Sequence, residues 1–213
     1  MTKKIMGVDI SRWNNVLSFK DIKNDGYEFV ILRAGGNNGG FYKDPKFETY
    51  YNEAKKAKLK VGAYYDTGKD FISAPVGFAC AEHFAKLLSG KQFDYPVYAD
   101  IETVTTVHRR SATLAFLSFA QTMEKSGYFV GCYASDISGF KDRLEKEYIE
   151  GRFTIWCARY GKEPTYIKDY AIWQKTNLGV VAGVQGAVDI DESYVDFPKI
   201  MKKKGLNGYG NKC

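Results

Sequence analysis

Tyr95-Pro96-Val97-Tyr98-Ala99-Asp100-Ile101-Glu102 is an apolar stretch that ends in two acidic residues. Its β-branched and aromatic residues are typical of a buried β-strand. Side chains alternate between the two faces of a strand, so Asp100 and Glu102 point the same way. Their Cα atoms would lie about 6.6 Å apart, close enough for each carboxyl to change the pKa of the other. Paired carboxyls suit acid/base catalysis, although two solvated acids at a strand end give the same triplet.

Strand and helix patterns alternate on both sides of this stretch. The periodicity predicts further strands over residues 5–10, 27–34, 59–66, 129–134, 153–160, 170–175 and 184–191, and helices over 19–24, 44–60, 74–88, 112–125, 137–148 and 194–204. Alternating strands and helices favour a parallel sheet with crossover helices, but the last third leaves little room for helices. We therefore predict an α/β fold, a (β/α) barrel of TIM type with an incomplete helical ring, built from about five β/α units followed by three strands.

Acidic residues recur where the predicted strands end. In a barrel of parallel strands the active site lies at their C-terminal ends, so these acids are expected to converge on one face. They are Asp9, Asp66, Asp100, Glu102 and Asp189. Two of them have a simpler interpretation, because Asp9 would also suit a helix cap and Asp66 would also cap the loop before Gly68.

Length and charge limit the classes of protein. The chain has 213 residues, which suits one domain, and we assign residues 1–204 to the barrel and residues 205–213 to a basic tail. Its net charge of +6 is a mild excess that favours an anionic polymer, such as a bacterial cell wall, over nucleic acid.

The sequence predicts neither a metal site nor a cofactor. The four cysteines form no C-x-x-C pair, and only two histidines accompany them. Cys132 and Cys157 lie in apolar runs and are predicted to be buried free thiols. No signal-peptide pattern opens the chain, and no apolar run reaches membrane-spanning length, so we expect a soluble protein without membrane insertion.

Several short motifs, in this order, resemble the lysozymes of glycoside hydrolase family 25, the Chalaropsis-type muramidases common among phage endolysins. The matching segments cover residues 5–200: Gly7-Val8-Asp9-Ile10-Ser11, Phe29-Val30-Ile31-Leu32-Arg33-Ala34, Val61-Gly62-Ala63-Tyr64-Tyr65, Pro96 to Glu102, Ile155-Trp156-Cys157-Ala158-Arg159-Tyr160, Ile172-Trp173-Gln174 and Gly186-Ala187-Val188-Asp189-Ile190.

The resemblance implies roles for particular residues. Glu102 would be the acid/base, and Asp100 would support the acetamido group of the substrate or act as the second carboxylate. Asp9 and Asp189 would complete an acidic floor. Predicted substrate-binding residues are Tyr64, Trp156 and Trp173 along a sugar groove, together with Asp66, Arg33 and Tyr133.

The chain departs from the family pattern at two places. Tyr64-Tyr65-Asp66 stands where the family usually has Tyr-His-Phe, and Gly35-Gly36 stands where many members have Thr-Glu. We interpret residues 35–40 as a flexible loop, with Asp66 as a candidate replacement for the missing glutamate.

The resemblance implies a lysozyme that hydrolyses the β-1,4 bond between N-acetylmuramic acid and N-acetylglucosamine in peptidoglycan. The alternatives are a non-catalytic wall-binding module and a chitinase-like hydrolase. We expect peptidoglycan glycan strands as the partner, no nucleic acid, and a monomer made in the cytoplasm that reaches the wall through lysis or a holin.

Overall fold

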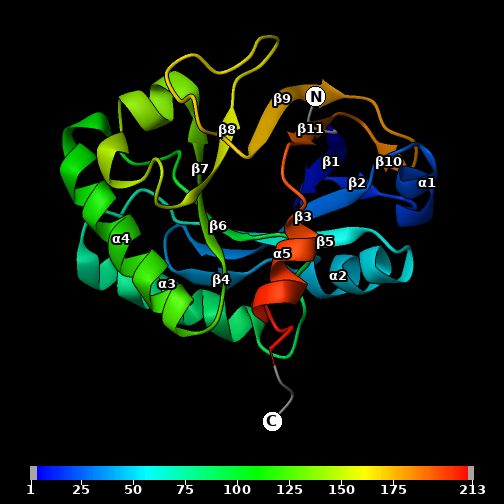
Figure 1. Ribbon diagram of the computed structural model, residues 1–213, viewed down its shortest axis with the longest axis horizontal. Coiled ribbons are helices and arrows are strands. Elements are labelled where there is room, and N and C mark those ends of the chain that lie inside the picture. Colours follow the sequence, from blue (N-terminus) through cyan, green and yellow to red (C-terminus); the bar gives the residue numbers. More distant parts are fainter. Residues whose placement is uncertain (1–3, 211–213) are drawn as a thin grey trace.

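A closed barrel of mixed strand direction forms the body of the protein (Figure 1). The computed structural model describes residues 4–210. The strands are β1 (Ile5–Ile10), β2 (Asn15–Val16), β3 (Phe29–Asn37), β4 (Phe41–Lys43), β5 (Lys60–Asp66), β6 (Val97–Asp100), β7 (Val130–Ser135), β8 (Thr154–Ala158), β9 (Ile172–Gly179), β10 (Val184–Gln185) and β11 (Val188–Ser193). The α-helices are α1 (Phe19–Asn24), α2 (Phe47–Lys56), α3 (Ala74–Leu88), α4 (Arg109–Lys125) and α5 (Phe197–Lys204).

The order of strands around the barrel is β1-β11-β9-β8-β7-β6-β5-β3, and pairing of β1 with β3 closes the ring. Most neighbours are parallel, but β11 runs antiparallel to both β1 and β9. The fifth β/α unit replaces its helix by a π-helical turn (Asp136–Lys141) and a 3₁₀ turn (Lys146–Tyr148). The predicted barrel with about five β/α units and three final strands is confirmed, but the prediction of one continuous helix over residues 137–148 is wrong.

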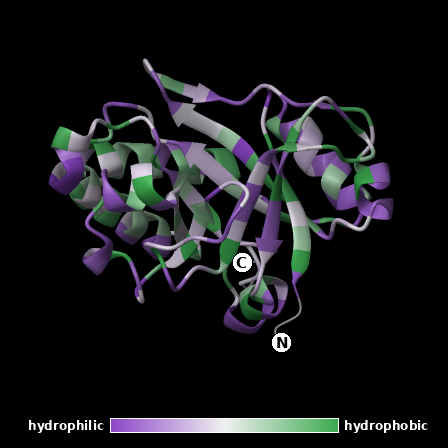
Figure 2. Cartoon of the chain, turned by 90° about the horizontal axis from the view of Figure 1, so that it is seen from above, coloured by the Kyte–Doolittle hydropathy of each residue, from purple (hydrophilic) through white to green (hydrophobic). Residues whose placement is uncertain are grey.

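The helices cover two flanks of the barrel. In Figure 1, α3 and α4 lie side by side on one flank, and α1 and α2 lie on the other. Hydrophobic and hydrophilic residues alternate along these helices, as expected for elements with one buried face (Figure 2). Among the described residues, none of the helices is long and apolar enough to cross a membrane.

The buried face of α3 includes Gly77, Ala81 and Leu88. Phe78 shares the helical spacing of Ala81 and Leu88 but is 52% exposed. A Cβ on Gly77 would lie 2.0 Å from the carbonyl oxygen of Ala115 on α4. The two helices therefore approach through small residues, which turns Phe78 outward.

Residues on alternate faces of the strands build two apolar layers. One layer fills the space between strands and helices, and the other fills the barrel with aromatic rings such as Tyr98, Tyr133 and Trp156. Glycines make room for these rings: a Cβ on Gly131 would lie 2.2 Å from the Tyr98 ring. The predicted buried free thiols of Cys132 and Cys157 are confirmed.

The bottom of the barrel is closed by α5 and the segment after it. Phe197 and Met201 pack into the inner apolar layer. Asn207 is fully buried, with its side chain donating to the Tyr95 carbonyl (2.8 Å) and accepting from the Phe129 N–H (2.7 Å). Residues 205–210, assigned from the sequence to a basic tail, therefore pack against the barrel, and residues 211–213 lie outside the described part.

The glycine-rich segment is more ordered than predicted. Gly35 and Gly36 belong to β3, where they pair with Lys43 and Tyr42 of β4, and only residues 38–40 form the turn. A Cβ on Gly35 would lie 2.2 Å from the Tyr42 carbonyl oxygen, so glycine permits this close strand approach.

Candidate active site

Four acids from different parts of the chain meet at one mouth of the barrel. Asp9 is the penultimate residue of β1, Asp100 ends β6, and Glu102 follows two residues later. Asp189 pairs directly with Asp9 in the ladder between β11 and β1. The sequence interpretation of Asp189 as a strand end is wrong: it is the second residue of β11, and it reaches the mouth because β11 is antiparallel.

A buried glutamine that the sequence analysis missed connects these acids. Gln174 on β9 donates from Nε2 to Asp9 Oδ2 (2.7 Å) and to Asp189 Oδ2 (3.4 Å). Its Oε1 accepts from the hydroxyl groups of Tyr133 (2.9 Å) and Tyr160 (3.2 Å). Burial raises the pKa of Asp189 only to about 6, so at neutral pH Asp189 is an acceptor alone and fixes the amide nitrogen on its side. No pattern in the sequence distinguished Gln174 from other polar residues in strands.

Tyr133 carries this network to Glu102. Its hydroxyl oxygen lies 3.2 Å from Glu102 Oε1 as well as 2.9 Å from Gln174 Oε1. A tyrosine has one hydroxyl hydrogen, so Tyr133 shares it between Glu102 Oε1 and Gln174 Oε1, and the latter oxygen also accepts from Tyr160. Donation from Tyr133 to Glu102 stabilises the ionised carboxyl and works against the rise in the pKa of Glu102.

The pKa values of Asp100 and Glu102 are both raised, which favours a proton on this acidic pair. Desolvation raises the pKa of Glu102 from its ordinary value, although the residue is partly exposed. The negative charge of Asp66 raises this pKa further, whereas the Tyr133 hydroxyl and Arg143 lower it. Desolvation also raises the pKa of Asp100 well above its usual range, reinforced by Glu102 and Asp66 and opposed by Arg33. Asp100 Oδ1 is buried and has no hydrogen-bond partner among residues 4–210.

The floor holds one more carboxyl than the sequence analysis assigned. Asp191 is fully buried on β11, and its Oδ1 accepts from the indole N–H of Trp156 (2.8 Å). Burial raises the pKa of Asp9 and Asp191 well above their usual range and that of Asp189 to about 6. The signal was present in Asp189-Ile190-Asp191, since residues two apart in a strand share a face.

The predicted sugar-binding residues do not all lie at the surface of the mouth. Trp156 is 1% exposed inside the barrel, so the prediction that it lines an open groove is wrong. Trp173 is 8% exposed and donates its indole N–H to the Arg159 carbonyl. Tyr133 is nearly buried beneath Glu102, while the half-buried Tyr64 stands near Asp9 and Arg33. These rings therefore pack beneath the acids and leave little of their surface for contact with a ligand.

Arg33 and Asp66 lie on the β3 side of the mouth. Arg33 Nε donates to Asp44 Oδ2 (2.9 Å), and both side chains are almost fully buried. Asp66 pairs in register with Asp100, accepts from the Tyr42 hydroxyl (2.8 Å) and accepts from the Gly68 N–H (3.2 Å). The structure thus gives Asp66 its loop-capping contact and also places it beside the acidic pair.

Two open hollows flank the acids. One, of about 420 Å³, is lined on the β3 side by residues that include Trp13, Phe41 and Tyr42. The other, of about 370 Å³, is lined on the β7–β8 side by residues that include Arg159 and Tyr160. Trp13 is 75% exposed, Phe41 53% and Tyr160 48%, so these rings, rather than Trp156, offer apolar faces at the mouth.

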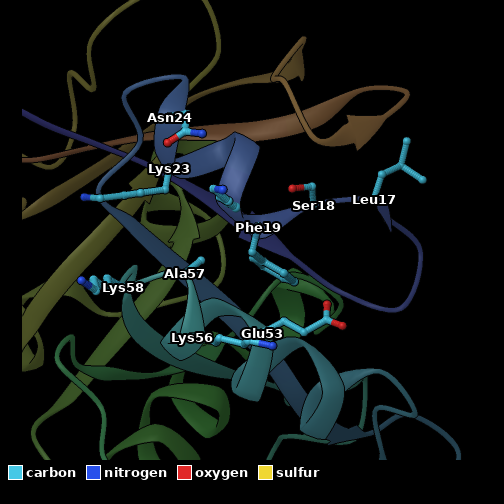
Figure 3. A pocket seen from close by; sticks show the side chains of 10 residues that line it. Leu17, Ser18, Phe19, Lys23, Asn24, Glu53, Lys56, Ala57 and Lys58 are labelled. Carbon is cyan, nitrogen blue, oxygen red and sulfur yellow. The ribbon is translucent and has the colours of Figure 1, made fainter.

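Another hollow, of about 510 Å³, lies between α1 and α2 (Figure 3). Phe19 forms its apolar part, and Lys23, Lys56 and Lys58 stand around it. None of the mouth acids lines it. Within the described residues, no group of three or more histidine, cysteine, aspartate or glutamate side chains is arranged to hold a metal ion.

Comparisons with known proteins agree with this arrangement. The model of the glycosyl hydrolases family 25 matches residues 8–184. An autolytic lysozyme of Clostridium acetobutylicum is 28% identical over 187 residues, which are 87% of this chain and 55% of that protein. The chain therefore spans about half the length of that relative.

Solved structures show the same fold. The CTP1L endolysin superposes with a TM-score of 0.79 at 28% identity, covering 94% of this chain and 70% of that one. A bacterial lysozyme from Streptomyces coelicolor superposes with a TM-score of 0.72 at 22% identity, covering 99% of this chain and 100% of that one. The family model covers most of the chain and includes Asp9, Asp100 and Glu102, and the chain belongs to glycoside hydrolase family 25.

Proposed function

We propose that the protein is a lysozyme that hydrolyses the β-1,4 bond between N-acetylmuramic acid and N-acetylglucosamine in bacterial peptidoglycan. Membership of family 25 and the similarity to an autolytic lysozyme support this assignment. The observation that carries it is the convergence of Asp9, Asp100, Glu102 and Asp189 at one mouth of the barrel, where Gln174 and Tyr133 connect Asp9 to Glu102 through hydrogen bonds.

Glu102 acts as the general acid and base. Its exposed position lets it reach a glycosidic oxygen, to which it gives its proton as the C–O bond breaks. Water then adds to the anomeric carbon and returns a proton to Glu102. The raised pKa of Glu102 keeps it protonated closer to neutral pH than an ordinary glutamate.

Asp100 ends β6 two residues before Glu102, and Glu102 is close enough to raise the pKa of Asp100. Asp100 supports the acetamido group of the substrate or serves as the second carboxylate. Its buried, unpartnered Oδ1 is suited to accept the N–H of an acetamido group. Asp9 and Asp189 complete the acidic floor, where negative charge stabilises the positive charge that develops on the sugar ring.

The remaining proposals concern the substrate groove, the oligomeric state and the route by which the protein reaches the wall. Tyr64, Asp66, Arg33, Tyr133 and Trp173 are proposed to shape and support the substrate groove. We propose that the protein acts as a monomer on wall glycan strands, without nucleic acid or membrane insertion, and reaches the wall through lysis of the producing cell or a holin.

Glu102→Gln tests the catalytic assignment. The amide keeps the size of the side chain but cannot deliver a proton, so release of reducing ends from purified peptidoglycan should fall by about 10²- to 10⁴-fold. The new reducing ends made by the wild type should be muramic acid, identified after borohydride reduction.

Glu147→Gln, at an exposed glutamate, is the matched control and should keep full activity. Wild-type turnover in a correctly folded Glu102→Gln variant would refute the assignment. Parallel zymograms on whole cell walls and on chitin separate the alternatives, since a binding module would clear neither and a chitinase-like enzyme would clear chitin.

A further inference from the structure

The hollow on the β3 side adjoins the acidic mouth directly. It is lined by segments that follow β1 and β3 and by the end of β5, through Arg12, Trp13, Arg33, Phe41, Tyr42 and Asp66. Asp66 pairs in register with Asp100 on the neighbouring strand. The hollow therefore begins one strand away from the acidic pair, and a glycan seated over Glu102 would extend into it.

Arg12 is held in position at the edge of this hollow. Its backbone N–H donates to Asp44 Oδ2 (3.0 Å). Its guanidinium carbon lies 4.6 Å from the centroid of the Trp13 ring and 5.5 Å from that of Tyr42. Stacking between aromatic rings restricts the side chain and leaves its N–H groups at the rim free to donate.

Two arginines, Arg12 and Arg33, and one carboxylate, Asp66, line the hollow, and Asp44 pairs with Arg33. Asp44 Oδ2 already accepts from Arg33 Nε and from the backbone N–H of Arg12. Asp66 is engaged by the Tyr42 hydroxyl and the Gly68 N–H. Among the described residues, the arginines in ion pairs are Arg33, Arg110 and Arg159, so Arg12 has no carboxylate partner there.

Arg33 adds a second unsatisfied group. It is 9% exposed, and its Nη2 is buried without an acceptor among residues 4–210. A buried guanidinium with one side pinned by Asp44 and the other side unpaired favours a further anion close to it. Exposed faces of Trp13 and Phe41 stand beside these two cations and suit the apolar part of the same ligand.

We propose that this hollow binds a carboxylate carried by the muramoyl residue of the substrate, either its lactyl group or the peptide attached to that group. This inference rests on the proposed lysozyme function. N-acetylglucosamine has no acidic group, whereas every muramoyl residue carries the lactyl ether and, in the wall, a peptide with carboxyl groups. Arg12 donates to the carboxylate, Trp13 and Phe41 contact its apolar carbons, and Arg33 supplies positive charge beneath.

Binding at this place would orient the glycan. A muramoyl residue and a glucosamine residue look alike along the sugar ring, so the acidic mouth alone distinguishes them poorly. A cationic hollow on one side of Glu102 sets the muramoyl substituent on the β3 side and thereby selects which of the two alternating bonds lies over the acids.

The test measures glycan affinity in the Glu102→Gln background, in which binding is separated from hydrolysis. The ligands are peptide-bearing glycans, peptide-free glycans with a lactyl carboxylate, an amidated neutral form of each, and a chitooligosaccharide of equal length. We expect at least one acidic form to bind about three- to fivefold more tightly than its amidated form, as a partly exposed ion pair allows. Adding Arg12→Gln should remove this preference and leave affinity for the neutral glycans unchanged.

Arg152→Gln is the matched control, because Arg152 is also exposed and lies 5.2 Å from an aromatic ring centroid, that of Phe153, ahead of β8. A preference restricted to the peptide-bearing glycan assigns the carboxylate to the peptide, and one that persists without peptide assigns it to the lactyl group. Equal affinity for acidic and amidated forms with Arg12 intact would overturn the inference, as would an equal loss in Arg152→Gln. If the wild type still releases muramic acid ends in that case, the lysozyme function stands; failure of both binding and hydrolysis overturns both.

Discussion

Asp191 shows how one buried carboxyl changes the electrostatics of the whole floor. Its charge raises the pKa of Asp9, and its own Oδ2 is buried without a hydrogen-bond partner among residues 4–210. Its other neighbours are Asp189 on the same strand, Gln174 on β9 and Trp156 on β8. The groups that shift its pKa include no cation from the described residues, so burial and neighbouring acids dominate.

The raised pKa of Asp191 predicts that the free energy of unfolding depends on pH. Unfolded aspartate loses its proton near pH 4, whereas the folded chain retains it because the pKa of Asp191 is raised. The folded state then binds more protons, so the free energy of unfolding falls as pH rises above the unfolded pKa and stops falling above the folded pKa. Asp191→Asn should flatten this decline by about 1.4 kcal/mol per pH unit within that window.

Urea unfolding at a series of pH values measures the slope. Asp169→Asn, at an exposed acid for which no stability effect is expected, serves as the control. Parallel slopes for wild type and Asp191→Asn would show that Asp191 holds no proton in the folded protein.

Asp66 has both a structural contact and an electrostatic role. Its negative charge raises the pKa of Glu102 and of Asp100. Asp66→Asn should therefore lower the pKa of the general acid and move the alkaline limb of the pH–rate profile to lower pH. It should also reduce the melting temperature, because Asp66 accepts from Tyr42 and Gly68.

Asp70→Asn makes the same charge change at an exposed residue of the following loop and should leave the profile in place. If the Asp66→Asn profile superimposes on that of the wild type while the melting temperature falls, Asp66 is a loop cap alone.

At the scale of elements, α5 has a task separate from catalysis. Phe197 at its start is 1% exposed and packs against Tyr95 and Phe129, with ring centroids 5.4 Å and 6.2 Å away. It closes the end of the barrel opposite the acids. An element in this position stabilises the fold without touching substrate.

Phe197→Ala should destabilise the protein by about 3–5 kcal/mol, because it leaves a cavity among aromatic rings. Thermal melting would record this loss, while activity on wall fragments well below the melting temperature should persist. Phe78→Ala is the matched control, since Phe78 is 52% exposed on α3 and its truncation should change stability little. Equal melting temperatures for the two variants would contradict the closing role of α5.

At the scale of the whole molecule, charge is divided between two regions. The net charge is +6, yet the mouth gathers at least five carboxyls: Asp9, Asp66, Asp100, Glu102 and Asp189. Cations stand outside this cluster, including Arg12 and Arg33 on one side and the lysines between α1 and α2. For the proposed lysozyme function, we expect the net positive charge to attract an anionic wall polymer and the acids to act on the sugar rings.

The sequence by itself determined the barrel, its five β/α units and five of the acids at the mouth, whereas Asp191 was missed. Strand and helix periodicity is local, and Asp100 and Glu102 share a face because alternation in a strand is a property of the backbone. Only the tertiary structure decided the rest. The antiparallel direction of β11 brings Asp189 to the mouth, Gln174 acquires its role from partners on three other strands, and Trp156 turns into the barrel. These outcomes depend on pairing and packing between residues far apart in the chain, which no short stretch of sequence specifies.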